Sequence, residues 1–152
     1  MHRFYLNGTS GRVGASWMTK EEREDDISDN IDWLNALNKQ IRSLGNFEKC
    51  IILGFSQGGA TAARWFNSPD MDADHLIMWS SIFPPDIEIE KLIHPNEKRN
   101  FFVIGTNDEY FNEDSYNEAV LFYSHLNFEV KTFTGEHNIH SETLHSILAE
   151  IR

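Results

Sequence analysis

The chain has 152 residues, of which 40% are hydrophobic and 24% charged, and this composition excludes a disordered or fibrous protein. The 24 acidic residues outnumber the 13 basic ones for a net charge of -11, and no basic cluster offsets them, so we expect no binding to nucleic acid. No apolar run reaches the roughly 20 residues of a membrane span, and no secretory signal opens the chain, which predicts a cytoplasmic protein.

The single cysteine, Cys50, excludes an internal disulfide and a cysteine-based zinc site. Its apolar neighbours predict a buried strand residue rather than a reactive thiol.

The first predicted elements are a short strand, a loop and a long helix. Phe4-Tyr5-Leu6 is typical of a strand and runs into a glycine-rich loop over residues 7–14. Thr19-Lys20-Glu21-Glu22 has the form of a capping box and predicts a helix start. Apolar residues then recur at helical spacing up to Gly45, at Ile27, Ile31, Leu34, Leu37, Ile41 and Leu44.

The rest of the chain alternates between strands and helices. The apolar runs and their boundaries predict strands over 48–55, 76–79, 101–104 and 128–133, and helices over 57–67, 113–126 and 140–151. Alternation of this kind predicts an α/β fold with a mainly parallel sheet of about five strands and helices on both faces. We expect a single domain over residues 1–152, whose ligands bind beyond the carboxyl ends of the strands.

Residues 54–58 match the pattern G-x-S-x-G, with Ser56 at its centre. In that motif the serine lies on a sharp turn between a strand and a helix, where side chains at the flanking positions would clash. The predicted strand before Gly54 and helix after Gly58 provide this context. Ser56 is therefore the candidate nucleophile, although a small-residue turn without chemistry is the alternative.

A serine nucleophile needs a histidine base, and the histidine needs a carboxylate to orient it, in the chain order serine, acid, histidine. Asp108 and His137 follow predicted strands in this order and are the candidate acid and base. Glu109 and Asp114 are alternative acids near Asp108.

The other histidines are weaker candidates for the catalytic base. His140 and His145 are alternative bases in the last helix, while the remaining four are expected at the surface or in loops: His2, His75, His94 and His125. The cluster around His137 contains no H-E-x-x-H pattern, so we expect no metal and no other cofactor.

Residues 51–60 resemble the nucleophile elbow of the phospholipase/carboxylesterase family of α/β-hydrolases, which includes acyl-protein thioesterases. Residues 105–108 (GTND) resemble the acid loop of that family, and residues 135–139 (GEHNI) resemble its terminal histidine motif. Ser16-Trp17 resembles a stretch near its substrate cleft. The resemblance implies a reduced α/β-hydrolase fold that hydrolyses carboxylic esters or thioesters through an acyl-serine intermediate.

The sequence departs from this family at its start. Family members open with a further strand and a His-Gly-x-Gly loop that supplies half of the oxyanion hole, and no such segment is found here. The backbone N–H of Gln57 would supply the other half. We hypothesise that the strand at residues 4–6 pairs with residues 50–53, which would make the loop over residues 7–11 a substitute donor.

Trp17, Ile82 and Phe83 are candidate lining residues of an acyl pocket, with ordinary packing under loops as the alternative. The function predicted first is a serine esterase or thioesterase acting on a small molecule, as a monomer or homodimer. The alternatives are a weak or inactive remnant that serves as a binding module, and a fragment of a longer esterase.

Overall fold

The structure is a computed structural model, and it describes residues 2–5, 13–19, 21–89 and 99–151. The chain divides into two compact units, Met1–Phe47 and Glu48–Arg152, which are described separately. No helix in these described ranges is long and apolar enough to cross a lipid bilayer.

The first unit contains a two-stranded antiparallel sheet, in which β1 (His2–Tyr5) pairs with β2 (Val13–Ser16). The hypothesis that the first strand pairs with residues 50–53 joins the two units and stays a prediction, whereas within the first unit β1 takes β2 as its partner. β2 was not predicted, since Gly14 and Ala15 give it little strand propensity. Residues 7–11, the suggested oxyanion loop, lie outside the described residues.

Helix α1 spans Arg23–Arg42 and begins later than its capping box predicts. Thr19 Oγ1 accepts a hydrogen bond from the Glu22 N–H at 3.2 Å, one turn ahead of the helix. The Asp26 carboxylate in turn accepts hydrogen bonds from the Thr19 N–H and hydroxyl, at 2.7 and 2.8 Å. Thr19 thus holds the turn that leads into α1 instead of capping the helix itself.

The second unit is built on a parallel sheet of four strands in the order β3-β4-β5-β6. The strands are β3 (Ile51–Phe55), β4 (His75–Trp79), β5 (Asn100–Gly105) and β6 (Phe128–Phe133). The sheet has four strands rather than about five because β1 belongs to the separate two-stranded sheet. Cys50, expected within the first of these strands, comes directly before β3 and is partly buried.

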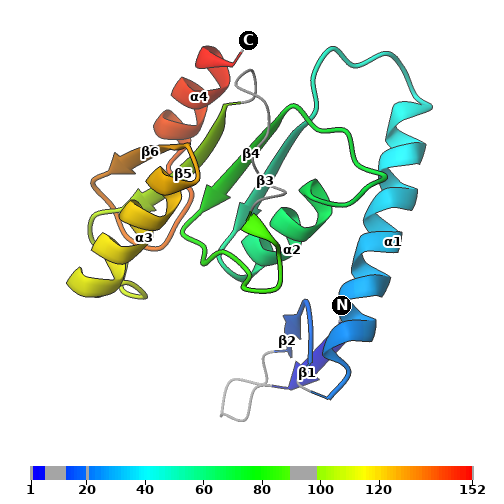
Figure 1. The fold of residues 1–152 in the computed structure, drawn as a ribbon, viewed down its shortest axis with the longest axis horizontal. Helices are drawn as coiled ribbons and strands as arrows, with labels where there is room; N and C mark the ends of the chain where they lie inside the picture. Colours follow the sequence, from blue (N-terminus) through cyan, green and yellow to red (C-terminus); the bar gives the residue numbers. More distant parts are fainter. Residues whose placement is uncertain (1, 6–12, 20, 90–98, 152) are drawn as a thin grey trace. The chain divides into compact units, whose positions relative to one another are not determined.

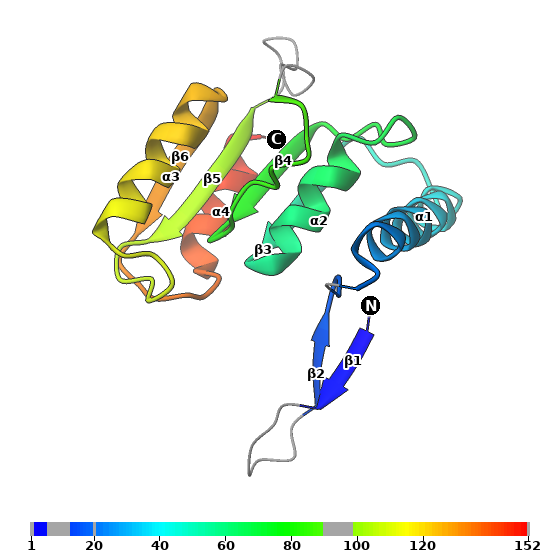
Figure 2. The same cartoon turned by 60° about the horizontal axis from the view of Figure 1, so that its bottom comes forward.

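Helices cover both faces of this sheet, as the alternation predicted. Helices α2 (Gln57–Phe66) and α3 (Glu113–His125) lie on one face, and α4 (Ser141–Glu150) lies on the other (Figure 1). Figure 2 shows α2 and α3 together in front of the strands, with α4 behind them. Alternate residues of β4 enter the two apolar cores, Leu76 and Met78 on the side of α2 and α3, Ile77 and Trp79 on the side of α4.

His75 is buried in this sheet, contrary to the prediction of a surface or loop position. It is the first residue of β4, is only 7% exposed, and its Nδ1 lies 2.8 Å from the carbonyl oxygen of Arg99. This contact gives the polar ring a partner inside the protein, which makes its burial tolerable.

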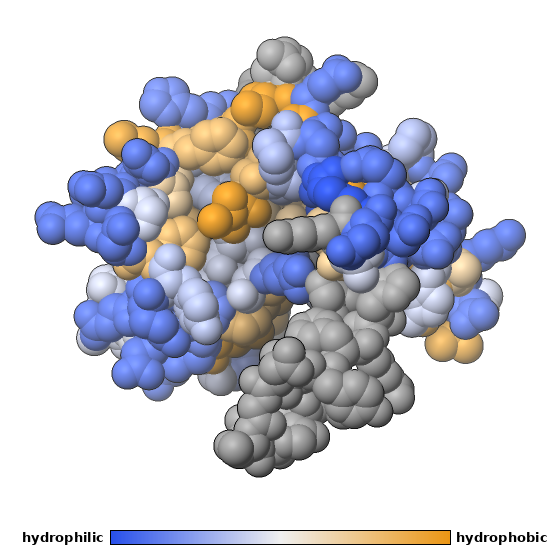
Figure 3. Space-filling view, turned by 90° about the horizontal axis from the view of Figure 1, so that it is seen from below, coloured by the Kyte–Doolittle hydropathy of each residue, from blue (hydrophilic) through white to orange (hydrophobic). Residues whose placement is uncertain are grey.

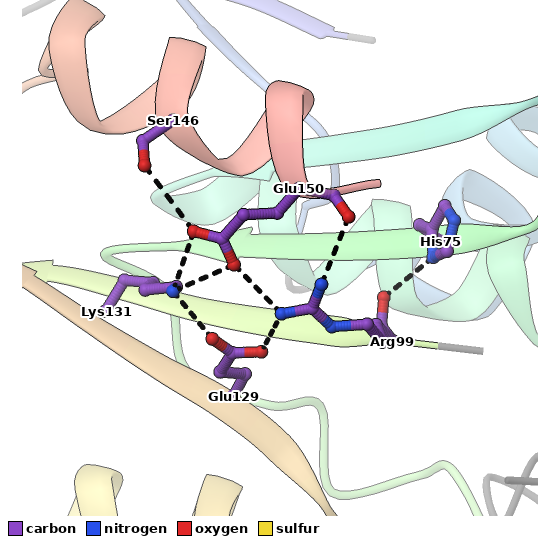
Figure 4. Close-up of polar contacts among 6 residues, drawn as sticks. All are labelled: His75, Arg99, Glu129, Lys131, Ser146 and Glu150. Carbon is purple, nitrogen blue, oxygen red and sulfur yellow. Dashed lines mark hydrogen bonds and ion pairs between the residues drawn. The ribbon is translucent and has the colours of Figure 1, made fainter. Parts of the chain in front are cut away.

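A cluster of four charged side chains joins the end of α4 to the sheet (Figure 4). Lys131 Nζ lies 2.6 Å from Glu129 and 3.0 Å from Glu150, and Arg99 lies 2.9 Å from Glu150 and also pairs with Glu129. Hydrogen bonds from Lys131 and then Arg99 lower the pKa of both carboxyl groups. The cluster fastens α4, which follows the loop that carries His137.

Candidate active site

Ser56 lies between β3 and α2 in a strained backbone conformation, with φ of 52° and ψ of -128°. A positive φ is costly for a residue with a side chain and is typical of a serine nucleophile at a strand-to-helix turn. The Ser56 N–H donates to the Trp79 carbonyl at 2.9 Å, and the Gly59 N–H donates to the Ser56 carbonyl at 3.0 Å. These two bonds tie the turn to β4 on one side and to α2 on the other.

Two glycines, one in the motif and one directly after it, allow β3, α2 and the loop after β4 to approach one another. A Cβ atom on Gly54 would lie 2.5 Å from Ala62 Cβ and 2.5 Å from Gly59 Cα, well inside van der Waals contact. A Cβ atom on Gly59 would lie 1.9 Å from Ser81 Oγ. The close packing of α2 against β3 and against the loop after β4 therefore depends on the absence of side chains at both positions.

The structure brings Ser56, His137 and Asp108 into one hydrogen-bonded chain. His137 Nε2 lies 2.9 Å from Ser56 Oγ. His137 Nδ1 lies 3.0 and 2.9 Å from the two carboxylate oxygens of Asp108. A neutral imidazole with its proton on Nδ1 would donate to the carboxylate and accept the serine proton at Nε2.

The loops that carry the acid and the histidine are bonded to each other beyond the ends of their strands. The Thr106 N–H donates to the Phe133 carbonyl at 2.9 Å, and the Asn107 N–H donates to the Gly135 carbonyl at 2.9 Å. A side chain on Gly105 would lie 2.4 Å from the same Gly135 oxygen. Glycine at position 105 thus allows the two loops to meet.

The surroundings of Asp108 differ from those of the two alternative acids, Glu109 and Asp114. The Asp108 side chain is fully buried, and its Oδ1 accepts a hydrogen bond from the Tyr110 N–H at 3.1 Å. Glu109 contacts the backbone of His137 instead of its ring, accepting from the N–H at 3.3 Å. Asp114 lies in the first turn of α3.

Two aromatic rings pack against the imidazole of His137. The ring centroid of Phe55 lies 4.8 Å away and that of Tyr110 lies 4.5 Å away. Tyr110 is 72% exposed and was not singled out from the sequence, although its place two residues after Asp108 puts it in the acid loop. The two rings limit the directions in which the imidazole can turn.

The alternative histidines have other surroundings. His140 is the N-cap of α4, accepts a hydrogen bond from the Thr143 N–H, and stacks on Phe133 at 5.1 Å. His145 is exposed on α4. Among the described residues, no group of three or more His, Cys, Asp or Glu side chains is arranged to hold a metal ion.

A cavity of about 330 Å³ opens beside Ser56 and His137. Its remaining lining residues come from the start of α2 and from the loops after β4 and β5: Gln57, Ala60, Ser80, Ser81, Ile82, Tyr110 and Phe111. Gln57 is the first residue of α2, where backbone N–H groups favour negative charge. Figure 3, which views the molecule from below relative to Figure 1, shows apolar residues exposed among polar ones.

The three candidate pocket residues lie in different places. Ile82 lines this cavity and also a neighbouring one of about 360 Å³, which Phe83 and residues of α3 line as well. Trp17 belongs to the first unit, where it lines a pocket with Asn30 and accepts a hydrogen bond from the Asn30 amide through its carbonyl oxygen.

Comparison with solved structures finds several proteins of the same fold. The structure of YahD with malic acid aligns with a TM-score of 0.60 at 17% identity, over 98% of this chain and 72% of that one. SOBER1 of Arabidopsis thaliana aligns with a TM-score of 0.62 at 20% identity, over 91% and 73%. A Bacillus cereus carboxylesterase aligns with a TM-score of 0.60 at 16% identity, over 96% and 71%. These likenesses confirm the predicted fold.

No protein among those with curated descriptions matches the chain. The family model described as serine hydrolase (FSH1) matches residues 7–146, which include Ser56, Asp108 and His137. The predicted resemblance to α/β-hydrolases of the carboxylesterase type is confirmed at this level. The chain belongs to the FSH1 serine hydrolase family.

Proposed function

We propose that this protein hydrolyses carboxylic esters or thioesters of small molecules through an acyl-serine intermediate. The observation that carries the proposal is the hydrogen-bonded chain from Asp108 through His137 to Ser56. Its three members come from the ends of three different strands, and the order along the chain is that of α/β-hydrolases.

In the proposed reaction Ser56 Oγ attacks the acyl carbonyl carbon while His137 Nε2 takes the hydroxyl proton. Asp108 holds the Nδ1 proton of the histidine and stabilises the imidazolium that forms. His137 then gives the proton to the departing alcohol or thiol. Water repeats the two steps with His137 as base, which releases the acid and restores Ser56.

The developing oxyanion would be stabilised by the backbone N–H of Gln57. This group follows Ser56 directly and stands at the N-terminus of α2, so both its position and the helix dipole favour negative charge there. One such donor contributes about a hundredfold to a thousandfold in rate in a serine protease. The loop over residues 7–11 remains a prediction as the second donor.

Apolar lining beside Ser56, from Ala60, Ile82 and Phe111, favours an uncharged acyl or alcohol group in the cavity. Trp17 and Phe83 remain predicted pocket residues. The cytoplasmic location and the monomeric or homodimeric state likewise remain predictions from the sequence.

A fluorophosphonate probe with a fluorescent tag tests the proposed nucleophile, because it modifies activated serines covalently. Wild-type protein should be labelled, and Ser56→Ala and His137→Ala should not be. Ser124→Ala is the matched control, since Ser124 is an exposed serine on α3 whose hydroxyl donates to the Val120 carbonyl. Absence of labelling in folded wild-type protein would contradict the proposal and favour a binding module.

The acyl intermediate is tested by stopped-flow hydrolysis of p-nitrophenyl butyrate. A burst of one p-nitrophenolate per Ser56, followed by slower turnover, is expected if deacylation limits the rate. Measuring kcat/KM for an ester and a thioester with the same butyryl group then decides which class the enzyme prefers. Equal hydrolysis by wild type and Ser56→Ala would overturn the mechanism.

A further inference from the structure

Ser80 has two unfavourable features at once. Its backbone φ is 45°, in the left-handed region that residues with side chains avoid. Its Oγ is buried and has no hydrogen-bond partner among the described residues, and the residue as a whole is 3% exposed. Each feature is unfavourable for folding, and a cost retained in this way points to a functional role.

Ser80 also lies beside the candidate nucleophile. Phe55 and Trp79, the last residues of β3 and β4, are paired, so Ser56 and Ser80 directly follow the ends of two neighbouring strands. Parallel neighbours in a sheet are about 4.8 Å apart. In the described part of the chain, buried side-chain atoms without hydrogen-bond partners occur on Arg64, Ser68 and Ser80. Of these three residues, only Ser80 lines the cavity beside Ser56.

The surrounding structure holds the strained backbone of Ser80 in place. Its N–H donates to the Val103 carbonyl at 2.8 Å, and the next residue, Ser81, accepts a hydrogen bond from the buried Tyr123 hydroxyl at 2.9 Å. Glycine would adopt the same φ without strain. The serine side chain is thus not needed for the turn, and its hydroxyl is available to a ligand.

We propose that the Ser80 hydroxyl hydrogen-bonds to an oxygen on the carbon next to the reacting carbonyl of the substrate. Because Ser80 lines the cavity, rotation about χ1 between staggered positions would turn Oγ toward a bound substrate. Since Ser56 and Ser80 follow the ends of neighbouring strands, an acyl group bonded to Ser56 Oγ would hold the substituent of its α-carbon within reach of Ser80. The substrate class is therefore an ester or thioester with a 2-alkoxy, 2-hydroxy or 2-oxo acyl group.

This inference rests on the proposed hydrolysis at Ser56, and a matched pair of substrates tests it separately. p-Nitrophenyl methoxyacetate and p-nitrophenyl butyrate differ by one oxygen in place of a methylene group, on the carbon next to the carbonyl. The quantity measured is the loss of kcat/KM on mutation, compared between the two esters, so that their different intrinsic reactivities cancel.

Ser80→Ala and Ser80→Gly should lose about five- to tenfold in kcat/KM on the methoxyacetate, the value of one neutral hydrogen bond, and less than about twofold on the butyrate. Both variants should keep or raise the melting temperature, since a buried unpaired hydroxyl is removed. Ser68→Ala is the matched control, because Ser68 Oγ is also buried without a partner and is not among the residues lining the cavity. It should leave both esters unaffected.

Equal losses on the two esters would overturn the inference and make Ser80 a residue that only supports the turn at Ser56. No loss on either ester would overturn it as well. If either of these results is found while the fluorophosphonate probe still labels the wild-type protein, the proposed hydrolysis is not contradicted. Failure of the wild type to react with the probe overturns both.

Discussion

The hydroxyl of Tyr123 on α3 donates a hydrogen bond of 2.9 Å to the carbonyl oxygen of Ser81, in the loop that follows β4. Tyr123 is 1% exposed and stacks on Phe102 of β5 at 4.0 Å. Burial raises the pKa of Tyr123 well above its usual value, so the hydroxyl stays protonated and remains a donor at neutral and mildly alkaline pH. This bond connects α3 to Ser81, which lines the cavity beside Ser56.

Tyr123→Phe should lower the free energy of unfolding by about 1–3 kcal/mol, because it leaves a buried carbonyl without its donor. Urea titration followed by tryptophan fluorescence measures the loss. Tyr116→Phe on the same helix is the control and should change stability by less than about 0.5 kcal/mol. Equal stability of Tyr123→Phe and wild type would show that the bond makes no net contribution.

Asp108→Asn should reduce kcat by about ten thousandfold, because an amide no longer fixes the histidine tautomer. Glu109→Gln should reduce it by less than about tenfold, since an amide oxygen still accepts from the backbone N–H of His137. Steady-state hydrolysis of a p-nitrophenyl ester measures both, with circular dichroism to check folding. A larger loss for Glu109→Gln would identify Glu109 as the acid instead.

Gly59→Ala should destabilise the protein by about 1–3 kcal/mol, as overpacking of a tight contact does. The new methyl group would overlap Ser81 Oγ and lie 2.4 Å from Ser81 Cβ, so the loop after β4 must shift. Gly45→Ala is the matched control, because nothing lies within 4 Å of a Cβ atom there. Thermal unfolding of the two variants should therefore differ, and identical melting temperatures would contradict the prediction.

The charged cluster at the end of α4 should make stability sensitive to acid. Hydrogen bonds from Lys131 and Arg99 lower the pKa of Glu129 below its ordinary 4.5, so the unfolded chain takes up protons first as pH falls. The stabilisation is present in full above that value and is lost as the pH falls through the folded-state pKa. The raised pKa values of Lys131 and Arg99 affect stability only in strong alkali.

Glu129→Gln should lower stability at pH 7 by less than about 1 kcal/mol, since the pair is partly exposed and screened by water. It should also flatten the fall in stability between about pH 5 and pH 3. Urea titrations at a series of pH values test this, with Glu118→Gln, an exposed carboxylate on α3, as control. An unchanged pH profile for Glu129→Gln would contradict the prediction.

The strands and helices of the second unit were predictable because their apolar runs are bounded by clear signals. Phe128–Phe133 was predicted with its observed bounds, and the helix after Ser56 differs by one residue at its end. Ser56 was named from its motif, and Asp108 and His137 were named from chain order and strand ends. Parallel strands bring their carboxyl ends to one edge, which is why such an argument can find residues far apart in the sequence.

The features that the sequence missed depend on contacts between distant segments. β2 has no strand signal of its own, and its existence follows from pairing with β1. The burial of His75 depends on a carbonyl from Arg99, and the position of Tyr110 against His137 depends on the fold of the acid loop. The positive φ of Ser80 is likewise imposed by its neighbours in space, and no residue pattern predicts it.

The bonds from Thr106 to Phe133 and from Asn107 to Gly135 extend the ladder between β5 and β6 into the loops of Asp108 and His137. Acid and base are therefore held by one continuous backbone register. A strand advances about 3.3 Å per residue, so deleting a single residue between Phe133 and His137 would shift the imidazole by more than a hydrogen bond can stretch. Residue count in this short segment is thus as much a requirement for catalysis as the identity of the three side chains.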